Sequence, residues 1–182
     1  FEPDMAKLAY DFENNALSVF KYQYETINIY QQFVDLLKIK TEEINQIDKI
    51  PFLPISFFKT HQVTDSVDKY ETLFESSGTT GFNTSRHFVT DLALYEQSFL
   101  KAFDVFYGDP GNYCILGLLP SYLERNTSSL VYMVAELIRK SKNLNSGFYL
   151  DEKEKLFQTI VHNELTRQPT FLIGVTYALL DF

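Results

Sequence analysis

One short run of the sequence combines the residue types that can hold a phosphate group. It reads Ser76, Ser77, Gly78, Thr79, Thr80 and Gly81 without a break. Glycines let the backbone turn so that several N–H groups face one concavity, and such a nest binds anions. Serine and threonine hydroxyls add small hydrogen-bond donors. The run is a candidate phosphate loop, but the same residue types also form solvated turns between strands, and composition alone does not separate the two.

Three common motifs do not fit this run. A P-loop requires lysine directly after its last glycine, whereas Phe82 and Asn83 follow Gly81. A dinucleotide-binding fingerprint requires Gly-x-Gly-x-x-Gly, which the spacing Gly-Thr-Thr-Gly does not supply. A nucleophile elbow requires a glycine two positions before its serine, and neither serine of the run has one. What remains is a strand followed by a hydroxyl-rich loop, a combination that suits a polyphosphate.

The elements around the loop predict the fold class. Strand character is expected at 70–75, 86–90, 113–119, 147–150 and 170–175. Helical spacing predicts helices over the intervening segments 92–107, 126–140 and 152–165. Their expected caps are Asp91, then Asn126 or Thr127, then Asp151. This alternation predicts an α/β fold with a largely parallel sheet flanked by helices.

A helical lead-in is expected before the sheet, over 1–60. Its last part, IPFLPISFFK at 50–59, breaks helicity because its two prolines lack a backbone donor, and its aromatic residues favour a buried crossing. Together with the alternating part, 70–182, the lead-in is expected to form a single domain. The chain opens on Phe1 and closes on the apolar run FLIGVTYALLDF, which favours a fragment of a longer protein.

Composition limits the possible partners. With 182 residues, 45% of them apolar, the chain can bury a sizeable core. A net charge of −8 argues against a nucleic-acid partner but does not exclude one small anion such as ATP with a metal ion. Cys114 is the single cysteine, so no internal disulfide can form. Neither a membrane-spanning apolar run nor a signal peptide is visible, so a cytoplasmic location is expected.

The loop and its flanks resemble a known family. ESSGTTG resembles the phosphate loop of the adenylate-forming superfamily, which includes acyl-CoA synthetases and aryl-CoA ligases. With IPFLPISFFK before it and CILGLLPSYLERNTSSLVYM after it, the sequence is more specifically similar to the acyl-protein synthetase (LuxE) family, which is found in luminescent and other bacteria. The resemblance spans about residues 45 to 182.

The resemblance implies an activity and its cofactors. Members of the family use ATP and Mg²⁺ to convert a carboxylic acid, here expected to be a fatty acid, into an acyl-adenylate. A thiol of a protein cysteine or of CoA then accepts the acyl group. The later motifs of the superfamily are not found, so the chain is expected to be an incomplete N-terminal portion that is inactive alone. An aryl-CoA ligase and a non-catalytic module that kept the fold stay open, as do a homo-oligomer and an acyl-reductase partner.

The resemblance also assigns candidate nucleotide-binding residues. The loop from Ser76 to Gly81 would hold the β- and γ-phosphates, with Ser77, Thr79 and Thr80 as side-chain donors. Many superfamily members have a lysine after the loop, but Asn83 and Thr84 stand in this region. Arg86 is the nearest substitute cation; the alternative is that it pairs with Glu75 or Asp91 at a strand end.

A second candidate segment follows the strand expected at 113–119. Ligands collect beyond the carboxyl ends of parallel strands, so this segment could face the acid substrate, or it could be an ordinary loop that leads into a helix. Its candidate residues are Pro120, Ser121, Tyr122 and Arg125. Cys114 lies among apolar residues and is expected to be buried. No catalytic residue and no set of metal ligands is identified.

Overall fold

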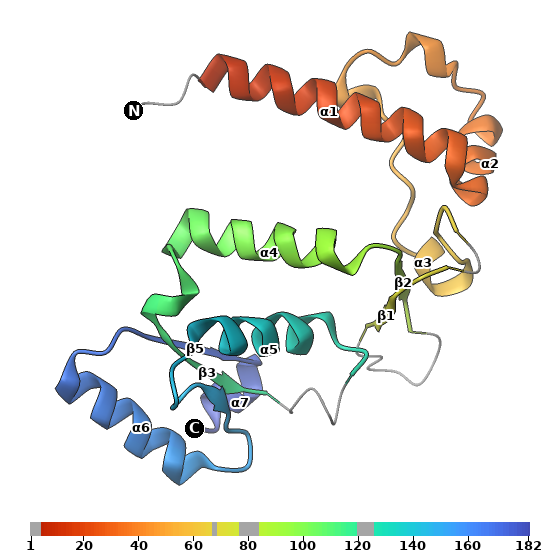
Figure 1. Cartoon of the computed structure of the whole chain (residues 1–182). Coiled ribbons are helices and arrows are strands. Elements are labelled where there is room, and N and C mark those ends of the chain that lie inside the picture. The colour runs from red at the N-terminus through yellow and green to blue at the C-terminus, as the bar shows by residue number, and fades with distance from the viewer. Residues whose placement is uncertain (1–4, 67–68, 77–83, 120–125) are drawn as a thin grey trace. The chain divides into compact units, whose positions relative to one another are not determined.

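The structure, a computed structural model, describes residues 5–66, 69–76, 84–119 and 126–182, with the backbone alone for 5–10. The chain divides into two compact units, Phe1–Thr90 and Asp91–Phe182 (Figure 1). The helical lead-in and the first two strands belong to the first unit, and the remaining strands belong to the second.

The first unit begins with helices that pack around one apolar cluster. Helices α1 (Met5–Thr26) and α2 (Asn28–Leu36) precede two short 3₁₀ helices, η1 (Thr41–Glu43) and η2 (Ile47–Lys49). The hydrophobic cluster that joins them consists of Phe20, Tyr30, Val34, Ile44 and Ile50. In proteins most of the stability of a helix comes from packing of its apolar face, and α2, with 9 residues, is too short to be stable alone, so this shared cluster is what holds α1 and α2 in place.

The proline-containing segment ends the helical region, as predicted. The chain is non-helical from Pro51 to Pro54, and the short helix α3 follows at Phe57–Thr60. The predicted burial of this segment is wrong for two residues. Phe52 and Ile55 have 69% and 78% of their surface exposed, because the chain there runs along the surface of the cluster.

A hairpin completes the first unit. Strands β1 (Thr72–Glu75) and β2 (Arg86–Val89) pair antiparallel, from Thr72 opposite Val89 to Glu75 opposite Arg86. The pairing continues by one step, because the Ser76 N–H donates to the Ser85 carbonyl at 3.0 Å. Helix α3 packs against β2. Both flanking strands of the candidate loop are therefore confirmed.

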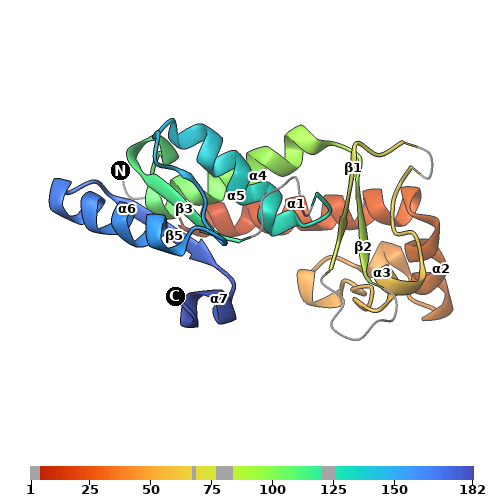
Figure 2. The same cartoon turned by 90° about the horizontal axis from the view of Figure 1, so that it is seen from below.

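The second unit contains a parallel sheet with the order β4–β3–β5. Two of its strands, β3 and β5, are labelled in Figure 2. Its strands are β3 (Cys114–Leu118), β4 (Gly147–Phe148) and β5 (Thr170–Gly174). The connecting helices are α4 (Leu92–Tyr107), the 3₁₀ helix η3 (Pro110–Asn112), α5 (Ser129–Ser141), α6 (Lys153–Thr166) and α7 (Thr176–Leu180). Among the described residues, no helix is long and apolar enough to cross a membrane.

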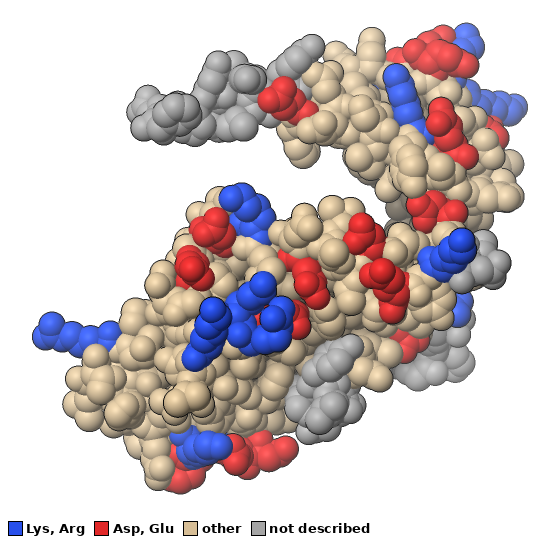
Figure 3. Space-filling view, viewed as in Figure 1, with Lys and Arg blue, Asp and Glu red and all other residues tan. Residues whose placement is uncertain are grey.

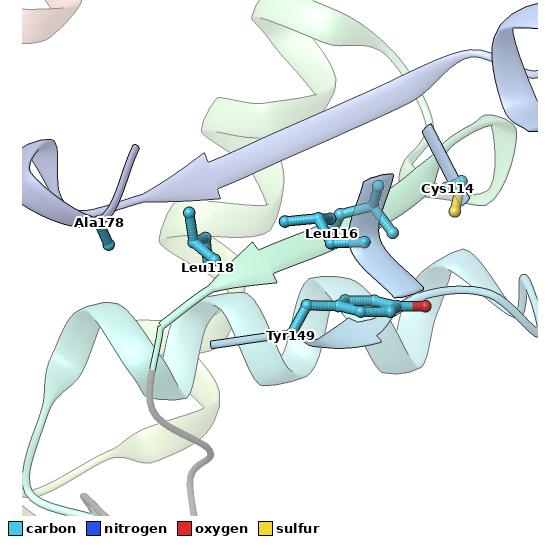
Figure 4. Close-up of a cluster of buried hydrophobic side chains, with 6 residues drawn as sticks. Cys114, Leu116, Leu118, Tyr149 and Ala178 are labelled. Atoms are coloured by element: carbon cyan, nitrogen blue, oxygen red, sulfur yellow. The ribbon is translucent and has the colours of Figure 1, made fainter. Parts of the chain in front are cut away.

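Successive side chains of β3 lie on alternate faces of the sheet and pack into two separate hydrophobic clusters. Cys114, Leu116 and Leu118 share a cluster with Leu156 of α6 and Ala178 of α7 (Figure 4). Ile115 instead packs with Phe103 of α4 and Leu137 of α5. Successive side chains of a strand point to opposite faces, so helices cover both faces of this sheet. The predicted α/β class is thereby confirmed.

Helix starts were predicted with mixed success. The Asp91 carboxylate accepts from the Leu94 N–H at 2.9 Å and caps α4 as predicted. The prediction of Asn126 or Thr127 as the cap of α5 is wrong, because the Ser128 hydroxyl accepts from the Val131 N–H. Asp151 does not cap α6, which begins one residue later, after Glu152.

Candidate anion-binding hollow beside the hairpin

Most of the predicted site residues lie outside the residues that the structure describes. In the loop these are Ser77, Gly78, Thr79, Thr80 and Gly81. After β3 they are Pro120, Ser121, Tyr122 and Arg125. Their assigned roles stay predictions. Ser76 and Arg86 are described, and they mark the two ends of β1 and β2 from which the loop extends.

Hydrogen bonds order both ends of the loop. The Ser76 hydroxyl accepts from the Ser85 N–H at 3.0 Å, which closes the last rung of the hairpin. The Thr84 hydroxyl donates to the Glu75 carboxylate at 3.3 Å. The Ser76 hydroxyl only accepts in this arrangement, so its own hydrogen can serve an anionic ligand. The Thr84 hydroxyl has a single hydrogen and would have to release Glu75 before it could donate to a ligand.

A polar hollow lies beside these loop ends. It has a volume of about 420 Å³ and is lined by Lys59, Thr60, Thr84 and Arg86. Its described lining residues therefore offer two cations and two hydroxyl groups, and none of them is a carboxylate. Cations and small hydroxyl donors are the groups that hold phosphate or carboxylate oxygens. The acidic neighbour of the hollow is Glu75, which accepts from Thr84 and lies opposite Arg86 in the hairpin.

Helix α3 reaches the hollow because of one aromatic contact. The Phe58 ring meets the His87 ring edge-on, with the ring centroids 6.4 Å apart. This contact fixes α3 against β2, and the two residues that follow Phe58 then line the hollow. The neighbouring His61 is occupied elsewhere, since it stacks on Phe57 and its Nδ1 lies 2.8 Å from the Thr60 hydroxyl.

Arg86 carries its charge without a carboxylate partner in the described hairpin. Glu75 lies directly opposite in the register, but it forms no ion pair with Arg86 and accepts from Thr84 instead. The Arg86 guanidinium carbon lies 5.8 Å from the centre of the Phe88 ring. Such an exposed cation–π contact contributes about 0.5–1 kcal/mol, which leaves the guanidinium donors available to a ligand.

His87 adds a neutral group next to the two cations. The residue as a whole is exposed, but its ring packs against Phe58, and this partial burial lowers the pKa of His87 below its ordinary value. Burial acts in this direction because it disfavours the charged imidazolium. At neutral pH the positive charge beside the loop therefore comes from Lys59 and Arg86.

The described residues do not offer a metal site. They contain no group of three or more His, Cys, Asp and Glu side chains that could hold a metal ion. The charges visible on the surface in Figure 3 are also mixed, with acidic and basic side chains interspersed on both units. On the face that Figure 3 shows, the mixed charges favour a local anion site such as the polar hollow over a broad basic surface.

Cys114 is buried, as predicted. Its exposed fraction is 0%, and its sulfur lies 4.0 Å from the Ser146 hydroxyl. That hydroxyl also accepts from the Ile115 N–H and from the Ser141 hydroxyl, each at 2.8 Å. Cys114 thus belongs to the packing of β3 and is not placed to exchange an acyl group.

The sequence-based prediction missed Lys59 and Thr60. A signal was present, because Lys59 is the last residue of the flank IPFLPISFFK on which the resemblance rests. It could not be distinguished from the other lysines, since only the packing of α3 on β2 brings it to the loop.

Comparison with known proteins places the hollow within a family. Residues 6–93, a little less than half of the chain, match the family described as acyl-protein synthetase, LuxE. The family prediction is confirmed over this range, which contains the hairpin and all four residues of the hollow. The matched range starts earlier than the predicted resemblance and ends before the second flank, 114–133. No curated protein and no solved structure matches the chain.

Proposed function

We propose that this chain, whose residues 6–93 match the LuxE acyl-protein synthetase family, takes part in the ATP-dependent activation of a carboxylic acid and its transfer to a thiol. The acid is expected to be a fatty acid and the acceptor a protein cysteine. The observation that carries the proposal is the polar hollow, because it brings Lys59 and Thr60 of α3 together with Thr84 and Arg86, which follow the candidate phosphate loop.

The strength of the hollow can be estimated. A hydrogen bond to a charged group contributes about 1.5–3 kcal/mol, so the four lining residues would give about 6–12 kcal/mol. Association of a ligand costs about 4–15 kcal/mol. The hollow alone is therefore at the margin of binding, and the loop donors Ser76 to Gly81 are included in the proposal as the groups that make phosphate binding productive.

The two cations have a defined task in this proposal. When bound, ATP supplies the phosphorus that the acid attacks. Lys59 and Arg86 hold the negatively charged oxygens and stabilise the charge that builds up on the departing pyrophosphate. They replace the lysine that many relatives in the superfamily have after the loop. The described residues contain no group of three or more His, Cys, Asp and Glu side chains, so a Mg²⁺ ion here would be held mainly by the phosphates of the nucleotide.

The test is exchange of labelled pyrophosphate into ATP by the full-length protein, measured with a panel of fatty and aryl acids. We expect exchange that depends on a fatty acid. Lys59→Gln and Arg86→Gln should each lower it about tenfold to a hundredfold, from the loss of about 1.5–3 kcal/mol. Lys69→Gln is the matched control, because it removes the same charge from the same unit outside the hollow.

Other outcomes would change the proposal. Exchange that persists at full rate in both variants would remove the hollow from the phosphate site. Exchange only with aryl acids, followed by transfer to CoA, would support an aryl-CoA ligase. ATP binding without exchange for any acid would support a module that kept the fold but not the chemistry.

A further inference from the structure

An apolar pocket lies in the first unit. Helix α3 contributes Phe58 to its lining, whereas Lys59 and Thr60 of the same helix line the polar hollow. The pocket has a volume of about 290 Å³ and is enclosed by α1, the start of α2 and the segment from Ile47 to Val63. Among the lining side chains that the structure describes, all except Gln23 are aliphatic or aromatic. Pockets of this composition bind small apolar groups, and few occur in one protein.

The pocket has a packed floor and an exposed apolar rim. Phe20, Tyr30 and Ile50 form the floor, and each is buried. Phe12 and Phe52 line the pocket as well, yet they have 66% and 69% of their surface exposed. A ligand that covers this rim removes apolar surface from water, which is the main source of free energy for binding an apolar group.

Helix α3 joins the apolar pocket to the polar hollow. Phe58 lines the pocket, and the next two residues, Lys59 and Thr60, line the hollow. One ligand with an alkyl tail and an anionic head would match both sites. This charge complementarity favours an amphiphile over a segment of protein.

We infer that the apolar pocket binds the alkyl chain of the acid substrate, with its carboxyl group directed towards the polar hollow. The identity of the ligand rests on the proposed function, whereas the binding of an alkyl chain does not. A water molecule in the liquid takes up about 30 Å³, and a methylene group is of similar size, so the pocket holds roughly ten methylene groups. The expected substrate is a medium-chain fatty acid.

The first experiment measures binding of saturated fatty acids by calorimetry, without ATP and below the concentration at which the acids aggregate. We expect affinity to rise about threefold to fourfold for each added methylene until the pocket is full at about ten, and then to level off. A series with no dependence on chain length would overturn the inference.

Two pairs of variants locate the binding. Ala16→Phe fills the pocket from α1 and should weaken binding at least tenfold, whereas Asn15→Phe adds the same ring on an exposed position of α1 that does not line the pocket. Phe52→Gln removes part of the rim and should weaken binding several-fold. Ile55→Gln is its control, since Ile55 is exposed in the same segment but does not line the pocket. If Ala16→Phe does not fold, the comparison of Phe52→Gln with Ile55→Gln still shows whether the ligand binds in the pocket.

The outcomes separate this inference from the proposed function. Pyrophosphate exchange with short acids, together with no chain-length dependence, would leave the function standing and reject the alkyl site. Binding that follows chain length without exchange for any acid would support the alkyl site and reject the function. If fatty acids do not bind and Ala16→Phe changes the oligomeric state, the pocket is a protein contact and the inference is wrong.

Discussion

Lys59 of α3 and Arg86 of β2 line the same polar hollow, although neither forms an ion pair with a carboxylate among the described residues. Two like charges that share a hollow repel each other, and a bound anion relieves the repulsion. The pair is thus arranged to be more stable with an anion present than without one.

The first prediction concerns this pair of cations. Binding of inorganic pyrophosphate should fall about tenfold in Lys59→Gln and in Arg86→Gln, because each variant loses one charge-assisted hydrogen bond. The losses should not add in the double variant if both cations contact one anion. Titration calorimetry at two ionic strengths measures this, and Lys69→Gln is the control. Equal binding in all variants would show that the hollow does not hold the anion.

The second prediction concerns the pH dependence set by His87. Its pKa is lower in the folded protein than the ordinary value of about 6.5, so the unfolded chain takes up this proton first as the pH falls. The free energy of unfolding should therefore decrease as the pH falls from about 7.5 through 6.5 towards the lower pKa of the folded state. In His87→Gln this part of the decrease should vanish.

Urea unfolding at a series of pH values measures the effect. His162→Gln removes an exposed imidazole from the second unit and controls for the loss of a histidine as such. Parallel pH profiles for His87→Gln and the unchanged protein would show that packing against Phe58 does not affect the histidine.

The third prediction concerns Cys114. Because its side chain is fully buried among the residues of β3 and α6, Cys114→Ala should leave acyl transfer unchanged and cost about 1 kcal/mol of stability. Thermal unfolding and a transfer assay with labelled fatty acid measure both quantities. Recovery of a labelled thioester on Cys114 would contradict the structural role.

The fourth prediction concerns a close approach in the parallel sheet. A Cβ atom at Gly117 would lie 2.9 Å from Cδ1 of Phe148, which is too close for a contact, and 3.2 Å from Cγ1 of Val134, which is a tight contact. Gly117→Ala should therefore destabilise the protein by about 1–3 kcal/mol.

The matched control lies in the neighbouring strand. At Gly147 a Cβ atom would meet Tyr149 at 3.7 Å, an ordinary contact, so Gly147→Ala should have little effect. Chemical unfolding of both variants compares them directly. Equal losses of stability in Gly117→Ala and Gly147→Ala would show that the close approach of Phe148 does not destabilise a side chain at position 117.

The sequence by itself determined the local elements. Alternation of apolar and polar residues and helical spacing act over a few residues, so all five predicted strands appear within two residues of their expected ends. The same holds for the cap at Asp91 and for the burial of Cys114 in an apolar run. Ser128 was missed as a cap because several adjacent residues in this segment have side chains that can cap a helix. The cap is the residue with extended backbone directly before the helix, and in the structure that residue is Ser128.

Only the tertiary structure decided what surrounds the loop. Lys59 and Arg86 are far apart in the sequence, and they share a hollow because the contact between Phe58 and His87 fixes α3 against β2. The apolar pocket depends in the same way on how α1, α2 and the proline-containing segment pack. Residue type and spacing report local backbone preference and carry no distance between separate elements, so neither site could be derived until packing had brought the elements together.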